Sequence, residues 1–251
     1  MNFSDKTAVV TGGSTGIGFA TAKLLLEQGA RVTITGQNRA RLDAAAQSLE
    51  AFGDHVSTAI VEMRRPADLI ALHAQVQQQY GKLDVLFANA GVAFATPLES
   101  TTEERFDEMF DINVKSVYFT VQHLAPLMQS GSSIVLNTSW LAETGTAGLS
   151  LLSASKAAVR SMTRTLAAEL LSRGIRVNAV SPGAIATPIH GKNGMKPDEL
   201  ATFAANIQQG VPLGRFGEAE EVAAAVVFLA GSGSAYMLGS EVVVDGGFSQ
   251  L

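Results

Sequence analysis

The segment that most constrains the fold is a glycine-rich run, TGGSTGIG, at residues 11–18. It follows a short β-branched run, Thr7–Val10, and a helix-like apolar pattern continues after it. A strand that passes through glycines into a helix leaves backbone N–H groups free at the helix start, where the helix dipole also favours an anion. Gly12 allows the tight turn, Gly16 a close approach to a ligand, and Gly18 tight helix–strand packing. The segment therefore predicts a pyrophosphate site.

Strand and helix signals alternate along the whole chain, which predicts a mostly parallel sheet with helices on both faces. The expected strands are Thr7–Val10, Arg31–Thr35, His55–Val61, Val85–Ala88, Ser133–Thr138, Arg176–Val180 and Glu241–Asp245. After the first helix, the expected helices are Ala40–Phe52, Pro66–Tyr80, Thr102–Met128 with an interruption near Asn113, Leu151–Arg173 and Glu218–Ala230. Weak periodicity over residues 184–215 indicates a flexible substrate flap. We predict one α/β domain over residues 1–251.

Composition narrows the partners of such a domain. A net charge of −5 argues against a nucleic acid or an anionic membrane surface as partner. No apolar run approaches the ~18 residues of a membrane span, and the first residues lack the pattern of a signal peptide. The chain has no cysteine and four scattered histidines, so we expect neither disulfides nor a metal site. These features favour a cytoplasmic protein that acts on a small molecule.

Ligands of open α/β sheets bind beyond the carboxyl ends of the strands, so the segments that follow the strands carry the functional information. Those segments closely resemble the classical short-chain dehydrogenase/reductase family, and the resemblance covers essentially the whole chain. The matching segments are TGGSTGIG at 11–18, ANAG at 88–91, SPGAIATP at 181–188, GRFGEAEEVAAAVVFLAG at 214–231 and VVVDGG at 242–247. The resemblance implies a single-domain, doubly wound, seven-stranded parallel sheet of Rossmann type. It also implies a nicotinamide dinucleotide and a homotetramer or homodimer.

The resemblance further implies which residues contact the cofactor. They are Gly12, Ser14, Thr15, Gly16, Ile17, Gly18, Gln37, Asn38, Arg39, Glu62, Met63, Asn89, Ala90, Gly91, Lys156, Pro182, Gly183, Ile185 and Thr187. An acidic residue after the second strand would bind the ribose hydroxyls of NAD, but this position reads Gly36-Gln37-Asn38-Arg39. Arg39 and Arg41 are close enough to meet a 2′-phosphate. We therefore expect NADP(H) rather than NAD(H), with a solvated helix start as the alternative role of the two arginines.

The catalytic set of the family is an Asn, a Ser and a Tyr-x-x-x-Lys pair. Asn113 in DINVKS, Ser139 after the fifth strand and Lys156 in LSASK match three of these residues. The tyrosine belongs four residues before Lys156, one helical turn away on the same face. That position holds Leu152, and no tyrosine lies within residues 133–173. The group that donates the proton in the family is therefore missing from its position.

Three interpretations fit the missing tyrosine. In the first, the chain is an oxidoreductase whose proton comes from water, Lys156 or a replacement acid. In the second, it is a cofactor-binding pseudoenzyme that acts as a sensor, partner or non-redox catalyst. In the third, leucine was introduced by engineering into an ordinary reductase. Retention of Asn113, Ser139 and Lys156 favours the first and third interpretations. His190 and Glu143 are candidate replacement acids, each with a solvated loop position as the alternative.

The residues around the missing tyrosine indicate an apolar substrate. Ser139 is expected to polarise a carbonyl, and the expected pocket wall consists of Trp140, Leu141, Leu152 and His190. We predict a small apolar ketone, aldehyde or secondary alcohol as the substrate. Trp140 is the only tryptophan of the chain, and ordinary core packing is its alternative role.

Overall fold

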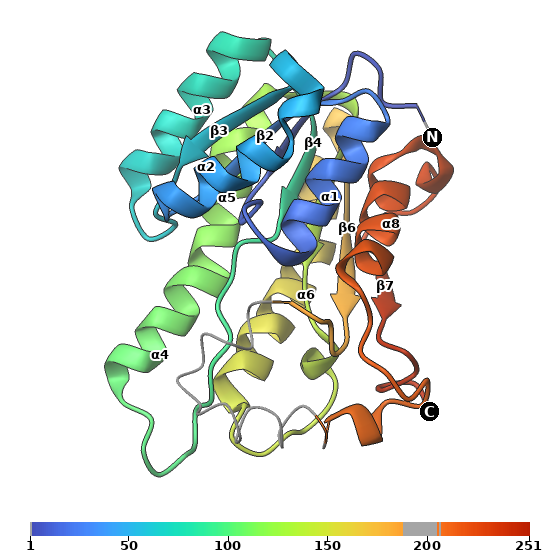
Figure 1. Cartoon of the computed structure of the whole chain (residues 1–251). Helices are drawn as coiled ribbons and strands as arrows, with labels where there is room; N and C mark the ends of the chain where they lie inside the picture. Colours follow the sequence, from blue (N-terminus) through green and yellow to red (C-terminus); the bar gives the residue numbers. More distant parts are fainter. Residues whose placement is uncertain (1, 188–204, 206) are drawn as a thin grey trace.

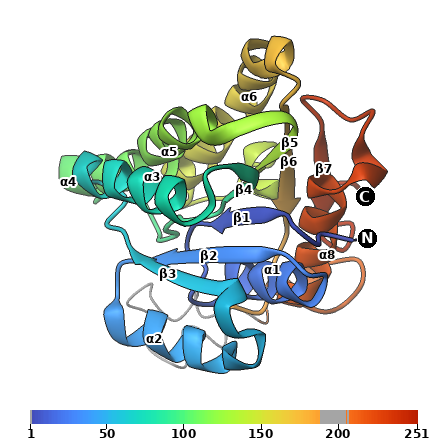
Figure 2. The same cartoon turned by 90° about the horizontal axis from the view of Figure 1, so that it is seen from above.

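A single parallel sheet organises the computed structural model, which describes residues 2–187, 205 and 207–251. Its seven strands lie in the order β3-β2-β1-β4-β5-β6-β7 (Figures 1 and 2). The strands are β1 (Thr7–Val10), β2 (Arg31–Gly36), β3 (Val56–Ile60), β4 (Leu83–Ala88), β5 (Met128–Asn137), β6 (Arg176–Pro182) and β7 (Glu241–Val244). The chain moves outward from β1 to β3, returns to β4 beside β1, and then continues to β7 on the other side. This reversal creates a crevice at the carboxyl ends of β1 and β4.

Helices cover both faces of the sheet, as Figure 2 shows. One face carries α3 (Pro66–Tyr80), α4 (Glu103–Phe110), α5 (Ser116–Leu124) and α6 (Ser150–Leu170), and the other carries α1 (Gly16–Glu27), α2 (Arg39–Ser48) and α8 (Ala219–Ala230). Each face has its own apolar core, with Leu72, Val121 and Val159 on one side and Leu25, Leu42 and Val226 on the other. Strands buried on both faces explain the apolar runs that marked them in the sequence. The expected seven-stranded Rossmann-type architecture is confirmed.

Two helix predictions were wrong in detail. The helix expected over Ala40–Phe52 ends at Ser48, and a 3₁₀ segment over Glu50–His55 follows. Gly53 within this segment has φ 54°, which breaks the helical path. The region expected over Thr102–Met128 is α-helical only as far as Leu124, where α5 ends, and Met128 already belongs to β5. Its predicted interruption near Asn113 is a π-helical turn over Asp111–Lys115. Such turns are rare and often occur at functional sites.

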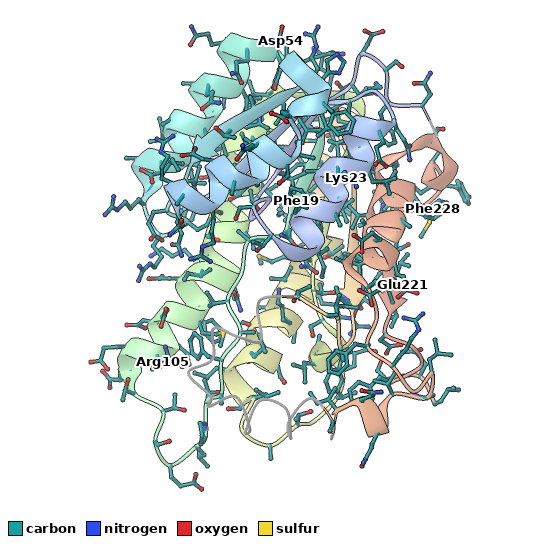
Figure 3. The ribbon with its side chains drawn as sticks, viewed as in Figure 1. Phe19, Lys23, Asp54, Arg105, Glu221 and Phe228 are labelled. Carbon is teal, nitrogen blue, oxygen red and sulfur yellow. The ribbon has the colours of Figure 1, made fainter. Side chains whose placement is uncertain are left out.

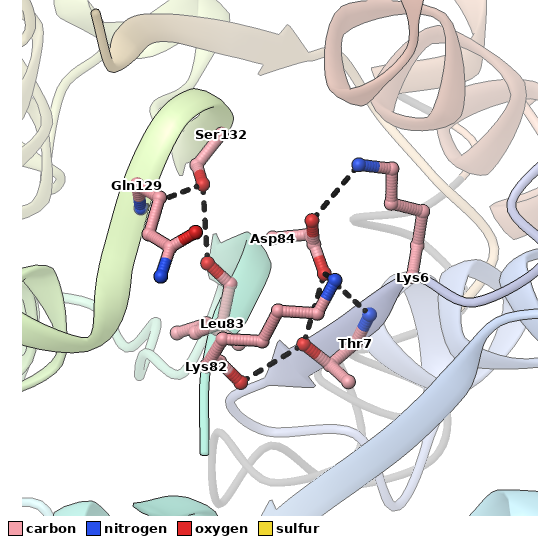
Figure 4. A network of polar contacts seen from close by, with 7 residues as sticks. All are labelled: Lys6, Thr7, Lys82, Leu83, Asp84, Gln129 and Ser132. Atoms are coloured by element: carbon pink, nitrogen blue, oxygen red, sulfur yellow. Dashed lines mark hydrogen bonds and ion pairs between the residues drawn. The ribbon is translucent and has the colours of Figure 1, made fainter. Parts of the chain in front are cut away.

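A polar cluster at the opposite end of the sheet from the crevice joins β1 to β4 (Figure 4). Asp84 accepts hydrogen bonds from Lys6 Nζ at 2.9 Å and from the backbone N–H and hydroxyl of Thr7 at 3.0 and 3.1 Å. Lys82 Nζ lies 3.4 Å from the same carboxylate. Burial alone raises the pKa of Asp84, but these bonds and charges outweigh it, so its pKa is lowered. The cluster therefore fixes the two strands that flank the crevice.

None of the helices within the described residues is long and apolar enough to cross a membrane. The same part of the chain contains no group of three or more His, Cys, Asp or Glu side chains placed to hold a metal ion.

Candidate active site

A cavity of about 500 Å³ lies over the carboxyl ends of the strands. It runs from the glycine loop after β1, past the end of β4, to the segments that follow β5 and β6. Its wall includes most of the expected cofactor residues: Gly12, Ser14, Thr15, Gly16, Ile17, Gln37, Asn38, Glu62, Met63, Asn89, Ala90, Gly91, Lys156, Pro182, Gly183, Ile185 and Thr187. The cavity is thus long enough to connect the expected pyrophosphate site with the expected catalytic residues.

Two of the expected cofactor residues do not line this cavity. Gly18 is buried beneath the glycine loop, where an added Cβ would lie 2.3 Å from the Gly12 carbonyl oxygen. Its role is the close packing of helix and strand. Arg39 is exposed at the first position of α2, whereas Arg41 lines the cavity. Residues two apart on a helix point about 200° apart, so only one of these arginines can face the ligand.

The glycine loop is held by a hydrogen-bond relay that the sequence patterns did not reveal. The Thr11 hydroxyl accepts the backbone N–H groups of Asn89 and Ala90 at 2.9 and 3.0 Å. Asn89 Nδ2 donates to the Thr11 carbonyl at 2.9 Å, and Asn137 Nδ2 donates to Asn89 Oδ1 at 2.9 Å. The relay therefore ties the ends of β1, β4 and β5 together around the crevice.

The cavity has features that fit a dinucleotide. The Thr35 hydroxyl and Asn137 Oδ1 are buried, line the cavity and have no hydrogen-bond partner among the described residues. Buried polar atoms without partners are uncommon in native proteins and suit a polar ligand or water. Close to Lys156, a Cβ added to Gly91 would lie 3.1 Å from Asn113 Oδ1. The absence of that side chain keeps the space beside Asn113 open.

Asn113 is held at the π-helical turn between α4 and α5. Its Oδ1 accepts the Val92 backbone N–H at 2.8 Å, and its Nδ2 donates to the Val92 carbonyl at 2.9 Å. Nδ2 also lies 3.2 Å from Ser155 Oγ on α6. The side chain is 1% exposed, so these bonds fix its position. The interrupted helix thus joins α6 to the loop that follows β4.

Ser139 and Lys156 lie on the other side of the crevice. Ser139 precedes the 3₁₀ turn Trp140–Ala142 (η4), and its Oγ accepts the Leu141 backbone N–H at 3.3 Å. Lys156 Nζ, from α6, donates to the Asn137 carbonyl at 2.8 Å. Burial lowers the pKa of Lys156 to about 8. A lysine with such a pKa exchanges a proton near neutral pH more readily than an exposed lysine does.

Comparison with known proteins identifies the family to which this arrangement belongs. A family model described as enoyl-(acyl carrier protein) reductase matches residues 12–249. The oxidoreductase asL5 of Sarocladium schorii is 44% identical, and the alignment covers 100% of this chain and 98% of that protein. The chain belongs to the classical short-chain dehydrogenase/reductase family. Its members are NAD(P)-dependent oxidoreductases that act on alcohol and carbonyl groups.

Three further proteins resemble the chain over nearly its whole length. The 3-oxoacyl-[acyl-carrier-protein] reductase FabG of Thermotoga maritima is 36% identical, over 98% of this chain and 99% of that protein. The crystal structure of levodione reductase superposes with a TM-score of 0.93 at 30% identity, covering 99% of both chains. A blue fluorescent protein from a metagenomic library, solved in complex with NADPH, superposes with a TM-score of 0.90 at 35% identity, covering 99% of this chain and 100% of that one.

Leu152 belongs to an apolar cluster at the catalytic end of the cavity. Its side chain is 7% exposed and clusters with Phe94, Met109 and Leu141, all buried. Trp140 packs against the edge of the cluster and against Phe248, with ring centroids 4.2 Å apart and the ring planes tilted by 35°. The Arg105 guanidinium on α4 lies 3.8 Å from the centre of the Phe94 ring; Figure 3 labels Arg105. This end of the cavity therefore has an apolar wall that includes Trp140, Leu141 and Leu152.

The two candidate replacement acids have different outcomes. Glu143 does not line the cavity and instead forms an ion pair with Arg160 on α6. His190 lies outside the described residues, as does most of the expected flap over 184–215. Of the described residues that line the cavity, Lys156 is the one beside Ser139 and Asn113 that can carry a proton near neutral pH.

The sequence analysis missed two aromatic residues at this end of the cavity, Phe94 and Phe248, because neither belongs to a motif.

Proposed function

We propose that the chain is an NADP(H)-dependent oxidoreductase that interconverts a small apolar carbonyl compound and its secondary alcohol. The observation that carries this proposal is the continuity of one cavity from the glycine loop to Ser139 and Lys156, where its wall becomes apolar. A bound nicotinamide would supply or accept the hydride at the carbonyl carbon. We also propose that residues 1–251 act as one domain.

In this proposal, Ser139, Lys156 and Asn113 supply the remaining functions: carbonyl polarisation, proton transfer and positioning. The Ser139 hydroxyl is free to donate its hydrogen to a carbonyl oxygen, because its Oγ accepts the Leu141 N–H. Lys156, as an ammonium, delivers the proton to the alkoxide oxygen through water during reduction and takes it back during oxidation. Asn113 holds the loop that follows β4 and keeps α6 in place.

The preference for NADP(H) rests on charges at the adenosine end of the cavity. A recess of about 340 Å³ adjoins it, lined by Arg41 and Arg65 together with Gln37 and Asn38. Glu62 and Asp68 also border this recess; the Glu62 carboxylate pairs with Arg64 at 3.2 Å, and the Asp68 carboxylate accepts the Glu62 backbone N–H at 2.8 Å. Among the described residues, Arg41 and Arg65 form no ion pair, so their guanidinium groups remain available to a 2′-phosphate at this recess.

A second function, cofactor binding without redox turnover, is favoured by Leu152. A buried leucine cannot donate a proton, and a positioned acid contributes about 10²–10⁴-fold in rate. In this alternative, the chain binds NADP(H) as a sensor, partner or non-redox catalyst.

One experiment separates the two functions. We would titrate the purified protein with NADPH and NADH by quenching of Trp140 emission, and then follow NADPH oxidation with a panel of apolar and charged aldehydes and ketones. Tighter binding of NADPH together with turnover of apolar carbonyls supports the oxidoreductase. Binding without turnover of any panel member supports the second function. Absence of binding to either nucleotide contradicts both.

A further inference from the structure

An ion network outside the cavity joins the segment that bears Ser139 to α6. Arg160 on α6 donates from Nε to Glu241 Oε2 at 2.6 Å and pairs through its terminal nitrogen with Glu143. The Thr138 hydroxyl donates to the second oxygen of Glu241 at 2.5 Å. Thr138 precedes Ser139 directly, and Glu143 follows the η4 turn. One guanidinium is therefore connected to both ends of the segment that carries the Ser139 hydroxyl.

Arg160 lies one helical turn from Lys156, so the network is close to the candidate catalytic residues. Arg160 follows Lys156 by four residues, so the two side chains leave the same face of α6 one turn apart. Its side chain is 32% exposed, whereas that of Glu241 is 14% exposed and Thr138 is 2% exposed. Charge-assisted hydrogen bonds in a partly buried setting are stronger than exposed ion pairs. The planar guanidinium, with its fixed donors, suits two carboxylates that approach from different elements.

The site needs such a connection because Leu152 offers no polar contact to Ser139. In the described residues, the Oγ of Ser139 is bound through the Leu141 N–H of its own turn. On the cavity side, Leu152 contributes only apolar packing to this turn. Two residues of α6 therefore make the polar connections to this segment. Lys156 bonds to the Asn137 carbonyl just before it. Arg160 pairs with Glu143 after Ser139 and, through Glu241, reaches Thr138 before it.

We propose that Arg160 is a positioning residue that holds the segment 138–143 against α6, so that the Ser139 hydroxyl and Lys156 stay aligned on the substrate oxygen. This inference rests on the proposed oxidoreductase function for its catalytic consequence. The positioning of residues 138–143 by Arg160 does not depend on whether the protein turns over a substrate.

The test uses Trp140, the only tryptophan of the chain, as a reporter within the segment. Arg160→Met removes both ion pairs, and Arg164→Met removes an exposed arginine one turn further along α6 as the matched control. We expect acrylamide to quench Trp140 more strongly in R160M than in the wild type or R164M. We also expect kcat of R160M to fall about tenfold or more, as for a misplaced catalytic group. The affinity for NADPH should stay the same, because its expected contacts are intact.

Two further variants keep the test decisive if R160M folds poorly. Glu143→Gln breaks one arm of the network at an exposed side chain, and Arg160→Lys keeps the charge without the two-sided contact. Both should raise quenching relative to R164M, with E143Q between the wild type and R160M. Equal quenching in R164M and in all three network variants overturns the proposal, even if the wild type proves inactive. Raised quenching with unchanged kcat overturns the catalytic part. Absence of turnover in the wild type is a failure of the proposed function and leaves the quenching comparison to decide the positioning.

Discussion

At the scale of single residues, the proposed acid–base chemistry of the cavity depends on Leu152 and Lys156. The leucine is packed among apolar side chains and contributes no hydroxyl to this end of the cavity. Lys156 lies one turn away with a pKa lowered by burial. The proposed proton transfer therefore depends on the amine of Lys156.

Leu152→Tyr is expected to increase the rate of carbonyl reduction by about 10²–10⁴-fold, the typical contribution of a positioned general acid. The measurement is NADPH oxidation with the best apolar carbonyl of the panel. Leu151→Tyr is the matched control, since it adds a hydroxyl from a helix direction about 100° away. A folded L152Y protein that binds NADPH but gains no rate over L151Y would contradict a simple loss of the acid.

The pH dependence of reduction should report Lys156. The ammonium form donates the proton, so kcat is expected to fall as the pH rises through about 8. The profile would be recorded with saturating NADPH, and Lys156→Met should lose this limb together with most of the activity. A profile that stays flat from pH 7 to 9 in the wild type would exclude Lys156 as the acid.

At the scale of elements, the crevice is formed by contacts between loops and neighbouring strands. Gly18 illustrates this, because its role is to bring the start of α1 onto the turn after β1. The Asp84 cluster secures the same two strands, β1 and β4, at their other end. The local sequence determines where each helix and strand forms, and these tertiary contacts determine how far apart the helices and strands lie.

Gly18→Ala is expected to weaken NADPH binding severely, because the new Cβ would lie 2.3 Å from the Gly12 carbonyl oxygen and 2.6 Å from Asn89 Nδ2. The loop must shift to relieve this overlap. The nucleotide titration measures the effect, and Gly145→Ala, where nothing lies within 4 Å of the added Cβ, is the control. Equal affinities in the two variants would show that the loop does not bind the cofactor.

Asp84→Asn should lower the free energy of unfolding at neutral pH by about 1–3 kcal/mol, since it removes charge-assisted bonds to Lys6 and Thr7. The pKa of Asp84 is lowered in the folded state, so the unfolded chain takes up the proton first. The stabilisation is complete above the ordinary value of 3.8 and is lost as the pH falls through the lowered folded pKa. Urea unfolding of both proteins should therefore converge on acidification. A difference that is constant from pH 7 to pH 3 would contradict this origin.

At the scale of the whole molecule, α5 and α6 present a surface suited to self-association. Tyr118 and Phe119 on α5 are 41% and 38% exposed, and their rings meet edge to face at 5.5 Å. The adjoining face of α6 exposes small residues such as Ala154 and Ala157. Aromatic side chains beside small ones allow two helix pairs to approach closely.

We expect a homotetramer, or a homodimer, in sedimentation experiments, with the α5–α6 surface as an interface. Phe119→Glu should reduce the mass of the assembly, because a charge would be buried at the contact. Ile70→Glu, at a 56% exposed position on α3, is the control and should leave the assembly intact. A wild-type monomer at micromolar concentration would refute the expectation.

The amino-acid sequence was enough to predict the order of strands and helices and the glycine loop, whereas Asn113, Ser139, Leu152 and Lys156 were singled out by the family resemblance. The strand and helix order and the glycine loop depend on short spacings, such as a run of glycines between a strand and a helix. The same spacings identified the interrupted helix, although they could not show that the interruption is a π-helical turn.

Which side chains meet around the crevice became visible only in the folded chain. In the folded chain Arg41 lines the cavity and Arg39 does not. Phe248 packs against Trp140, and Glu143 forms an ion pair with Arg160. The bond between Thr138 and Glu241 joins residues 103 positions apart. No local pattern encodes such pairs, because they depend on how parallel strands and their loops are placed side by side after folding.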